Sequence, residues 1–202
     1  MFDRAAGALI APALGHIARP LHARGVHADA VTWIGFTLGI SAAVAIALSH
    51  TGVGLALLLA GRVADGLDGA LARLGRPTDR GAFLDITLDM LFYASVPLAF
   101  AVADPPANAL PAAVLLAAFI GTGSSFLAYA AVAARRGWHG AAYPAKGLHY
   151  LGGLTEGSET IACFALMCLF PQHFAWWAYG FAALCALTIA TRLVAGCRAF
   201  VE

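Results

Sequence analysis

Charge is the property that this sequence has least of. Only 11% of its 202 residues are Asp, Glu, Lys or Arg, whereas soluble domains carry about 25%. The formal net charge is +1 and the basic residues form no run, which argues against a nucleic-acid-binding surface. Hydrophobic residues make up 61% of the chain, and the mean hydropathy is +0.80. These values predict an integral membrane protein.

Paired cysteines and polar linkers are missing as well. The cysteines fall in apolar segments without CxxC spacing, so we interpret them as small buried hydrophobic residues rather than metal ligands or disulfides: Cys163, Cys168, Cys185 and Cys197. No internal repeat, low-complexity tract or soluble segment divides the chain. We therefore expect a single membrane domain over residues 1–202.

Six apolar stretches come close to the roughly 20 residues that a helix needs to cross a bilayer. They cover about 30–49, 53–74, 81–103, 109–134, 152–171 and 174–196. The basic residues fall in alternate connections, so the positive-inside rule places both ends of the chain in the cytoplasm. We expect an all-α integral membrane protein with six transmembrane helices, forming a bundle over residues 30–196.

Residues 2–22 precede this bundle. Their apolar side chains recur on roughly one side of a helix and their charges lie elsewhere, which is typical of an amphipathic helix in the membrane interface. A signal peptide is the alternative, because Arg4 precedes a short apolar run. Pro12 interrupts that run and no soluble domain follows it, so we expect the interfacial helix.

Four aspartates interrupt two of the apolar stretches. Asp65 and Asp68 are three residues apart, and Asp85 and Asp89 are four apart, so each pair shares one helix face. The connection 75–80 lets the two helices lie antiparallel with the carboxylates converging. An ionised Asp within a bilayer costs about 2.5–3.5 kcal/mol on insertion scales, so a compensating cation is expected. Carboxylates favour Mg²⁺ or Mn²⁺ over zinc, and four of them suit two ions.

Small residues surround the first aspartate pair: Gly61, Ala64, Gly66, Gly69, Ala70 and Ala72. They predict a floor without bulky side chains, where a ligand can approach the backbone. Tight helix packing is the alternative interpretation, because small residues also serve it in membranes. The neighbouring acids favour the ligand.

Eight positions in this region resemble the signature of the CDP-alcohol phosphotransferases: Asp65-x-x-Asp68-Gly69-x-x-Ala72-Arg73, then after seven residues Gly81-x-x-x-Asp85-x-x-x-Asp89. These membrane enzymes move a phosphoryl-linked group from a CDP-alcohol to a second alcohol and release CMP. The resemblance implies an enzyme of phospholipid biosynthesis that transfers a phosphatidyl group from CDP-diacylglycerol, or a related CDP-alcohol, to a small alcohol. It also implies that the protein forms a homodimer and that membrane lipid surrounds it.

The resemblance implies roles for individual residues. The metal ligands would be Asp65, Asp68, Asp85 and Asp89, and Asp89 would also be the general base. The residues assigned to binding the nucleotide and its phosphates are Gly69, Ala72, Arg73, Gly81, Thr32 and Arg62. The connection 75–80 lies on the predicted cytoplasmic side, so we expect the active site to face the cytoplasm at a bacterial inner membrane.

A second group of acids lies near the start of the fifth stretch. Relatives that use inositol phosphate tend to have Arg after each comparable Glu, but here Gly157 and Thr160 follow Glu156 and Glu159. Without that bidentate clamp, a neutral or cationic acceptor alcohol is favoured over a phosphorylated one. Structural ion pairs of these acids with the nearby cations are the alternative. The acceptor-site candidates are Lys146, His149, Glu156, Glu159, Arg135 and Arg136.

Functions of other classes fit less well. A cation or proton transporter would distribute its acids along a path and use discontinuous helices, whereas these acids cluster. A prenyltransferase of the UbiA type has widely separated Asp-rich motifs and more helices than this chain can supply. A structural membrane scaffold would leave four intramembrane acids without stabilisation.

Overall fold

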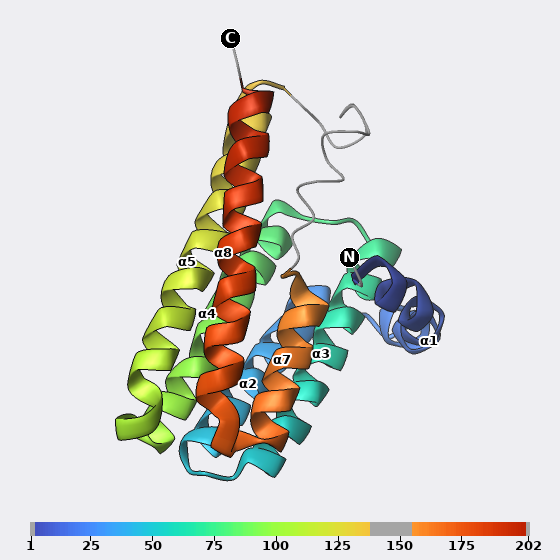
Figure 1. Ribbon diagram of the computed structural model, residues 1–202. Helices are drawn as coiled ribbons and strands as arrows, with labels where there is room; N and C mark the ends of the chain where they lie inside the picture. Colours follow the sequence, from blue (N-terminus) through green and yellow to red (C-terminus); the bar gives the residue numbers. More distant parts are fainter. Residues whose placement is uncertain (1–2, 138–154, 201–202) are drawn as a thin grey trace.

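The structure, a computed structural model, describes residues 3–137 and 155–200, and within these ranges it consists of helices joined by short connections, with no strand (Figure 1). The helices are α1 (Asp3–Ala23), α2 (Ala28–Ala47), α3 (Thr51–Leu74), α4 (Asp79–Ala103), α5 (Pro105–Arg135), α7 (Gly157–Leu169) and α8 (Phe174–Ala199), with a short 3₁₀ turn at Pro171–His173. The all-α class is therefore confirmed, and α1 lies where the N-terminal helix is expected.

Four helical segments are long and apolar enough to cross a membrane: α2, α4, α5 and Pro171–Ala199. The 24 residues of α3 span about 36 Å at 1.5 Å per residue, but this helix carries the charges of the signature. The 13 residues of α7 span only about 20 Å. The count of six spans and the orientation remain predictions.

The fifth apolar stretch begins later than expected. Its helix starts at Gly157 rather than near residue 152, because Glu156 and Glu159 form a reciprocal capping box. The Glu156 backbone N–H donates to Glu159 Oε2 at 3.3 Å. Such a cap satisfies backbone donors that the first turn leaves free, and it defines the start of the helix.

The helices pack in two groups that share the main hydrophobic core, and a second, smaller cluster lies between α1, α2 and α3. Helix α2 packs against α3 and α4, α5 packs against α4 and α8, and α1 lies across α3 (Figure 1). Aromatic rings join the groups, with Phe100 stacked on Phe174 at 4.6 Å between centroids and Phe92 edge-on to Phe164 at 6.2 Å. Three of the four cysteines are buried as expected, and all four are free thiols; Cys197, however, is exposed.

Glycines set the close crossing of α2 and α3. A Cβ at Gly61 would lie 3.1 Å from the carbonyl oxygen of Gly35 and 3.4 Å from the backbone nitrogen of Gly39, both in α2. Gly66 lies beneath Leu14 of α1, where an added Cβ would approach a Leu14 methyl to 2.8 Å. Part of the small-residue pattern therefore serves helix packing, the alternative that the sequence left open.

Replacing Gly61 with leucine is expected to lower the melting temperature in detergent by several degrees. The larger side chain must push α2 away from α3, and overpacking costs about 1–3 kcal/mol. The matched control is Gly52→Leu in the first turn of α3, where an added Cβ meets nothing within 4 Å. Equal melting temperatures for the two variants, measured by thermal denaturation, would contradict the close crossing.

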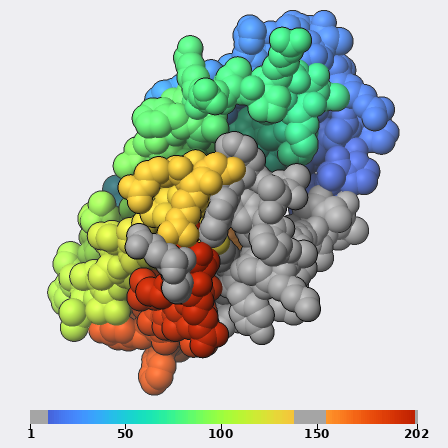
Figure 2. Space-filling view, turned by 90° about the horizontal axis from the view of Figure 1, so that it is seen from above, coloured from blue at the N-terminus to red at the C-terminus, as the bar shows by residue number. Residues whose placement is uncertain are grey.

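Several connections meet at one end of the bundle. The connection between α3 and α4 lies in the same half as the C-terminal ends of α5 and α8 (Figure 1). Viewed from above, α1 and the adjoining ends of α3 and α4 occupy one side, and the ends of α5 and α8 occupy the other (Figure 2). Arg135 in the last turn of α5 and Arg198 in that of α8 therefore share an end with the signature.

Candidate metal and nucleotide site

The turn between α3 and α4 brings the two aspartate pairs together. Thr78 caps α4, with its Oγ1 accepting a hydrogen bond from the backbone N–H of Gly81 at 3.0 Å. A Cβ at Gly81 would lie 3.2 Å from that Oγ1 and 3.4 Å from Asp29 Oδ1. Gly81 therefore permits the close approach of the cap and of α2.

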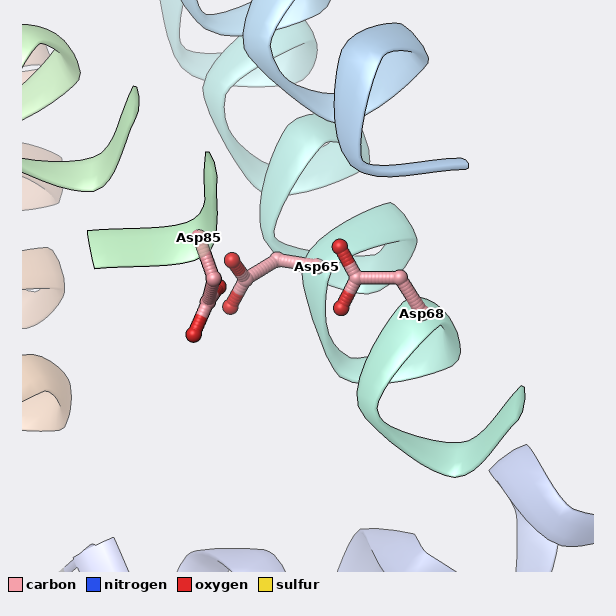
Figure 3. A group of neighbouring side chains, drawn as sticks. All are labelled: Asp65, Asp68 and Asp85. Carbon is pink, nitrogen blue, oxygen red and sulfur yellow. The ribbon is translucent and has the colours of Figure 1, made fainter. Parts of the chain in front are cut away.

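Three of the four carboxylates form one group. One oxygen from each of Asp65, Asp68 and Asp85 lies within 4.8 Å of the others, and the side chains point toward one another (Figure 3). Asp68 is 6% exposed, and its buried Oδ2 has no hydrogen-bond partner among the described residues. A buried carboxylate oxygen without a donor is costly, so the group fits a divalent cation with hard oxygen ligands.

Asp89 lies beside this group and is held by an arginine. Arg62 Nη1 donates to Asp89 Oδ1 at 2.9 Å and lies 3.4 Å from Asp65 Oδ2. The guanidinium also covers the Phe92 ring at 4.4 Å. The sequence assigned Arg62 to phosphate; in the structure it lies among the carboxylates, because the turn of α3 before Asp65 faces α4.

A cavity of about 730 Å³ opens next to the carboxylates. The start of α2, the end of α3 and the start of α4 form it, and Asp68 and Asp85 line it. Four of the residues that were expected to contact the nucleotide belong to the lining of this cavity: Thr32, Gly69, Ala72 and Gly81. The other two expected there, Arg73 and Arg62, do not belong to its lining. The cavity is large enough for a nucleotide and lies against the carboxylate group.

Cations at the cavity come instead from the turn before α4 and from the first turn of α4. Arg76 and Arg80 both line it. Arg80 Nε lies 3.3 Å from Asp29 Oδ2, an ion pair between the start of α4 and the first turn of α2. Asp29 lies in the first turn of α2, whose N-cap position is His27. The exposed Arg80 side chain leaves its guanidinium accessible to a phosphate from the solvent.

Only some of the residues that were expected at the acceptor site lie at a cavity. Glu156 lines a second cavity, of about 610 Å³, between α4, α5, α7 and α8, whereas Glu159 does not line it, although both side chains take part in the capping box. Arg136 donates to the carbonyl oxygen of Phe200 at 3.1 Å, and neither it nor Arg135 lines this cavity. The remaining candidates, Lys146 and His149, lie outside the described residues.

One residue at this second cavity was missed by the sequence reasoning. Arg192 of α8 lines it together with Glu156, and its Nη1 donates to the carbonyl oxygen of Thr122 at 3.0 Å. Thr155, also in the lining, donates to Thr188 of α8 at 3.0 Å. An arginine within the apolar run 174–196 was the available signal, because intramembrane charges mark functional sites.

Comparison with known proteins adds sequence relatives and solved structures. The model of the CDP-alcohol phosphatidyltransferase family matches residues 25–194. Inner membrane protein YnjF of Escherichia coli K12 is 50% identical over 196 residues, which is 97% of this chain and 95% of that protein.

The fold resembles that of phosphatidylinositol phosphate synthase PgsA1 from Mycobacterium tuberculosis, at a TM-score of 0.64 and 23% identity. The structure of that enzyme with CDP-DAG bound is matched over 91% of this chain and 92% of its own. Its complex with manganese and citrate is matched over 91% and 88%. The family model matches most of the sequence, and a relative is 50% identical over nearly the full length of both chains. This chain is therefore a member of the CDP-alcohol phosphatidyltransferase family.

Proposed function

We propose that this protein transfers a phosphatidyl group from CDP-diacylglycerol to a small alcohol and releases CMP. The observation that carries the proposal is the position of Asp68 and Asp85, which belong to the carboxylate group and also line the 730 Å³ cavity. A nucleotide in that cavity would bring its diphosphate against the metal ligands. The family provides the reaction class, and the bound CDP-DAG of the similarly folded PgsA1 supports the choice of donor.

A divalent ion, Mg²⁺ or Mn²⁺, would be held by Asp65, Asp68 and Asp85. When bound, it would neutralise the donor's phosphates and the charge that develops on departing CMP. The manganese complex of PgsA1 supports this choice of ion. Gly69 and Ala72 leave the cavity floor open to the nucleotide, while Arg76 and Arg80 attract its phosphates at the cavity wall.

Asp89 is proposed as the general base. It lines the small recess that also contains Asp65 and Asp85, and the next residue, Met90, lines the second cavity. This position between the two cavities suits a carboxylate that accepts the proton of the acceptor hydroxyl as the hydroxyl attacks the donor phosphate. The bond from that phosphate to CMP then breaks, and CMP leaves through the nucleotide cavity.

The second cavity is proposed to admit the acceptor. Among the described residues, its wall is mostly apolar and contains one carboxylate, Glu156, one guanidinium, Arg192, and the hydroxyls of three Thr residues and one Ser. Because the positions after Glu156 and Glu159 contain no arginine, we infer a neutral or cationic alcohol rather than a phosphorylated one. The cation and proton transporter alternative is disfavoured, because α3 and α4 are continuous helices through the acids.

The orientation in the membrane, the number of spans and the oligomeric state are also proposals. The end of the bundle with the α3–α4 connection would face the cytoplasm of a bacterial cell, which the shared position of the basic helix ends supports. The name of the relative, an inner membrane protein, supports the membrane assignment. Six spans, a single membrane domain and a homodimer complete the proposal, the last resting on the family resemblance.

The experiment that tests this function is CMP release by the purified, detergent-solubilised protein. The assay contains CDP-diacylglycerol, Mg²⁺ or Mn²⁺, and one of serine, inositol, inositol phosphate, glycerol phosphate, choline or ethanolamine. Metal-dependent release with one acceptor is expected. Binding of CDP-diacylglycerol without release in any arm would contradict the acceptor assignment, and the absence of both binding and release would contradict the activity.

Replacing Ala72 with phenylalanine is expected to weaken CDP binding at least tenfold while leaving Mn²⁺ binding unchanged. The added ring would fill part of the cavity, because Ala72 lines it, and Ala72 is not one of the proposed metal ligands. Ala60→Phe is the matched control, because Ala60 lies on the exposed face of the same helix. Titration of CDP by calorimetry measures the effect, and equal affinity in both variants would argue against this cavity as the nucleotide site.

A further inference from the structure

Arg62 is a cation buried at the carboxylate group. Its side chain is 16% exposed, on the helix turn that precedes Asp65. Nη1 lies 2.9 Å from Asp89 Oδ1 and 3.4 Å from Asp65 Oδ2. The rings of Phe92 and Tyr93 lie 4.4 and 5.9 Å from the guanidinium carbon. Two carboxylates and two aromatic faces therefore fix this guanidinium in one place.

The position of Arg62 divides the four carboxylates into two sets. Asp65, Asp68 and Asp85 converge on a common point without Asp89. Asp89 is instead bound through Oδ1 to the guanidinium, which also contacts Asp65. A cation that bridged Asp65 and Asp89 would have to take the oxygens that Arg62 now binds.

Charge balance favours the arginine in that position. Four carboxylates and one guanidinium carry a net charge of −3, which one divalent ion reduces to −1. A second divalent ion would make the site positive before any substrate binds, and it would lie against a guanidinium of the same sign. Like charges a few ångströms apart repel strongly where water is scarce. Aromatic packing and partial burial of Arg62 oppose its withdrawal.

We propose that Arg62 takes the place of a second divalent ion, so that this site binds one ion and one built-in guanidinium. The inference rests on the metal site of the proposed function and changes the expected number of ions from two to one. Arg62 is then a positioning residue, which orients the Asp89 carboxylate and leaves it free of metal. Such an arrangement keeps Asp89 available to accept a proton.

The test is the number of Mn²⁺ ions bound per chain by the full-length protein in detergent, measured by equilibrium dialysis and electron paramagnetic resonance. One ion with an isolated Mn²⁺ spectrum is expected for the wild type. Arg62→Met is expected to bind two ions with a spin-coupled spectrum, because the position beside Asp89 becomes vacant. Arg62→Lys retains the charge and is expected to bind one, as is the control Arg198→Met in the last turn of α8.

Each outcome decides a different question. Two coupled ions in the wild type would overturn the role of Arg62 while leaving the proposed function intact. A single ion in Arg62→Met, with the variant folded by size-exclusion chromatography, would also overturn it. If that variant does not fold, the counts for the wild type and Arg62→Lys still decide the proposal. A wild-type protein without bound Mn²⁺ would overturn the metal site itself, and with it the proposed mechanism.

Discussion

Asp68→Asn is expected to abolish Mn²⁺ binding and to lower CMP release by about 10³-fold or more. Asp68 is the most buried member of the carboxylate group, and its Oδ2 has no other partner among the described residues. Asparagine keeps the size of the side chain but removes its charge. A catalytic metal contributes several kcal/mol to the stabilisation of a transition state, and each 1.36 kcal/mol corresponds to about a tenfold change in rate.

The matched control for this variant is Asp104→Asn. Asp104 caps α5, accepting from the backbone N–H of Ala107 at 3.3 Å, and asparagine serves equally well as an N-cap. Mn²⁺ binding is measured by dialysis and CMP release by the acceptor assay. Full Mn²⁺ binding by Asp68→Asn would show that the ion is held elsewhere.

Asp89→Asn is expected to lower CMP release by about 10²–10⁴-fold, the usual contribution of a general base. Mn²⁺ binding and CDP affinity are expected to remain, because Asp89 is neither in the three-carboxylate group nor in the lining of the nucleotide cavity. The variant therefore separates the loss of a base from the loss of a metal ligand. The measurements are the same release and dialysis assays used for Asp68→Asn.

Asp79→Asn is the control for the second variant, since it removes a carboxylate from the exposed first turn of the same helix. Its CMP release is expected to stay close to that of the wild type. An Asp89→Asn protein that releases CMP at the wild-type rate would exclude Asp89 as the base. Loss of a bound Mn²⁺ in Asp89→Asn would assign this residue to the metal and would argue for two ions.

Local features of the site could be predicted from the sequence. The spacing of Asp65 with Asp68, and of Asp85 with Asp89, places each pair on one face because helix geometry repeats every 3.6 residues. Apolar runs of sufficient length predict helices for the same local reason, and six of the seven expected helices lie within a few residues of their predicted bounds. The family followed from the signature, which is contiguous in sequence.

Interactions between helices could not be predicted in the same way. Arg62 and Asp89 are 27 residues apart, and Arg192 and Thr122 are 70 apart. Whether such side chains meet depends on how the helices cross and on the rotation of each about its axis. The sequence showed Arg62 near the signature but gave no indication that α3 turns it toward Asp89 instead of toward the nucleotide.

The small residues illustrate the same difference between what local sequence predicts and what contacts between helices decide. Composition alone predicted both a ligand floor and close packing, and the tertiary structure assigned Gly61 to the crossing with α2 and Gly69 with Ala72 to the cavity. The sequence by itself therefore determined the helices, the aspartate pairs and the family. Tertiary structure decided which carboxylates converge, which arginine binds among them and which small residues line the cavity, because these depend on packing between segments distant in the chain.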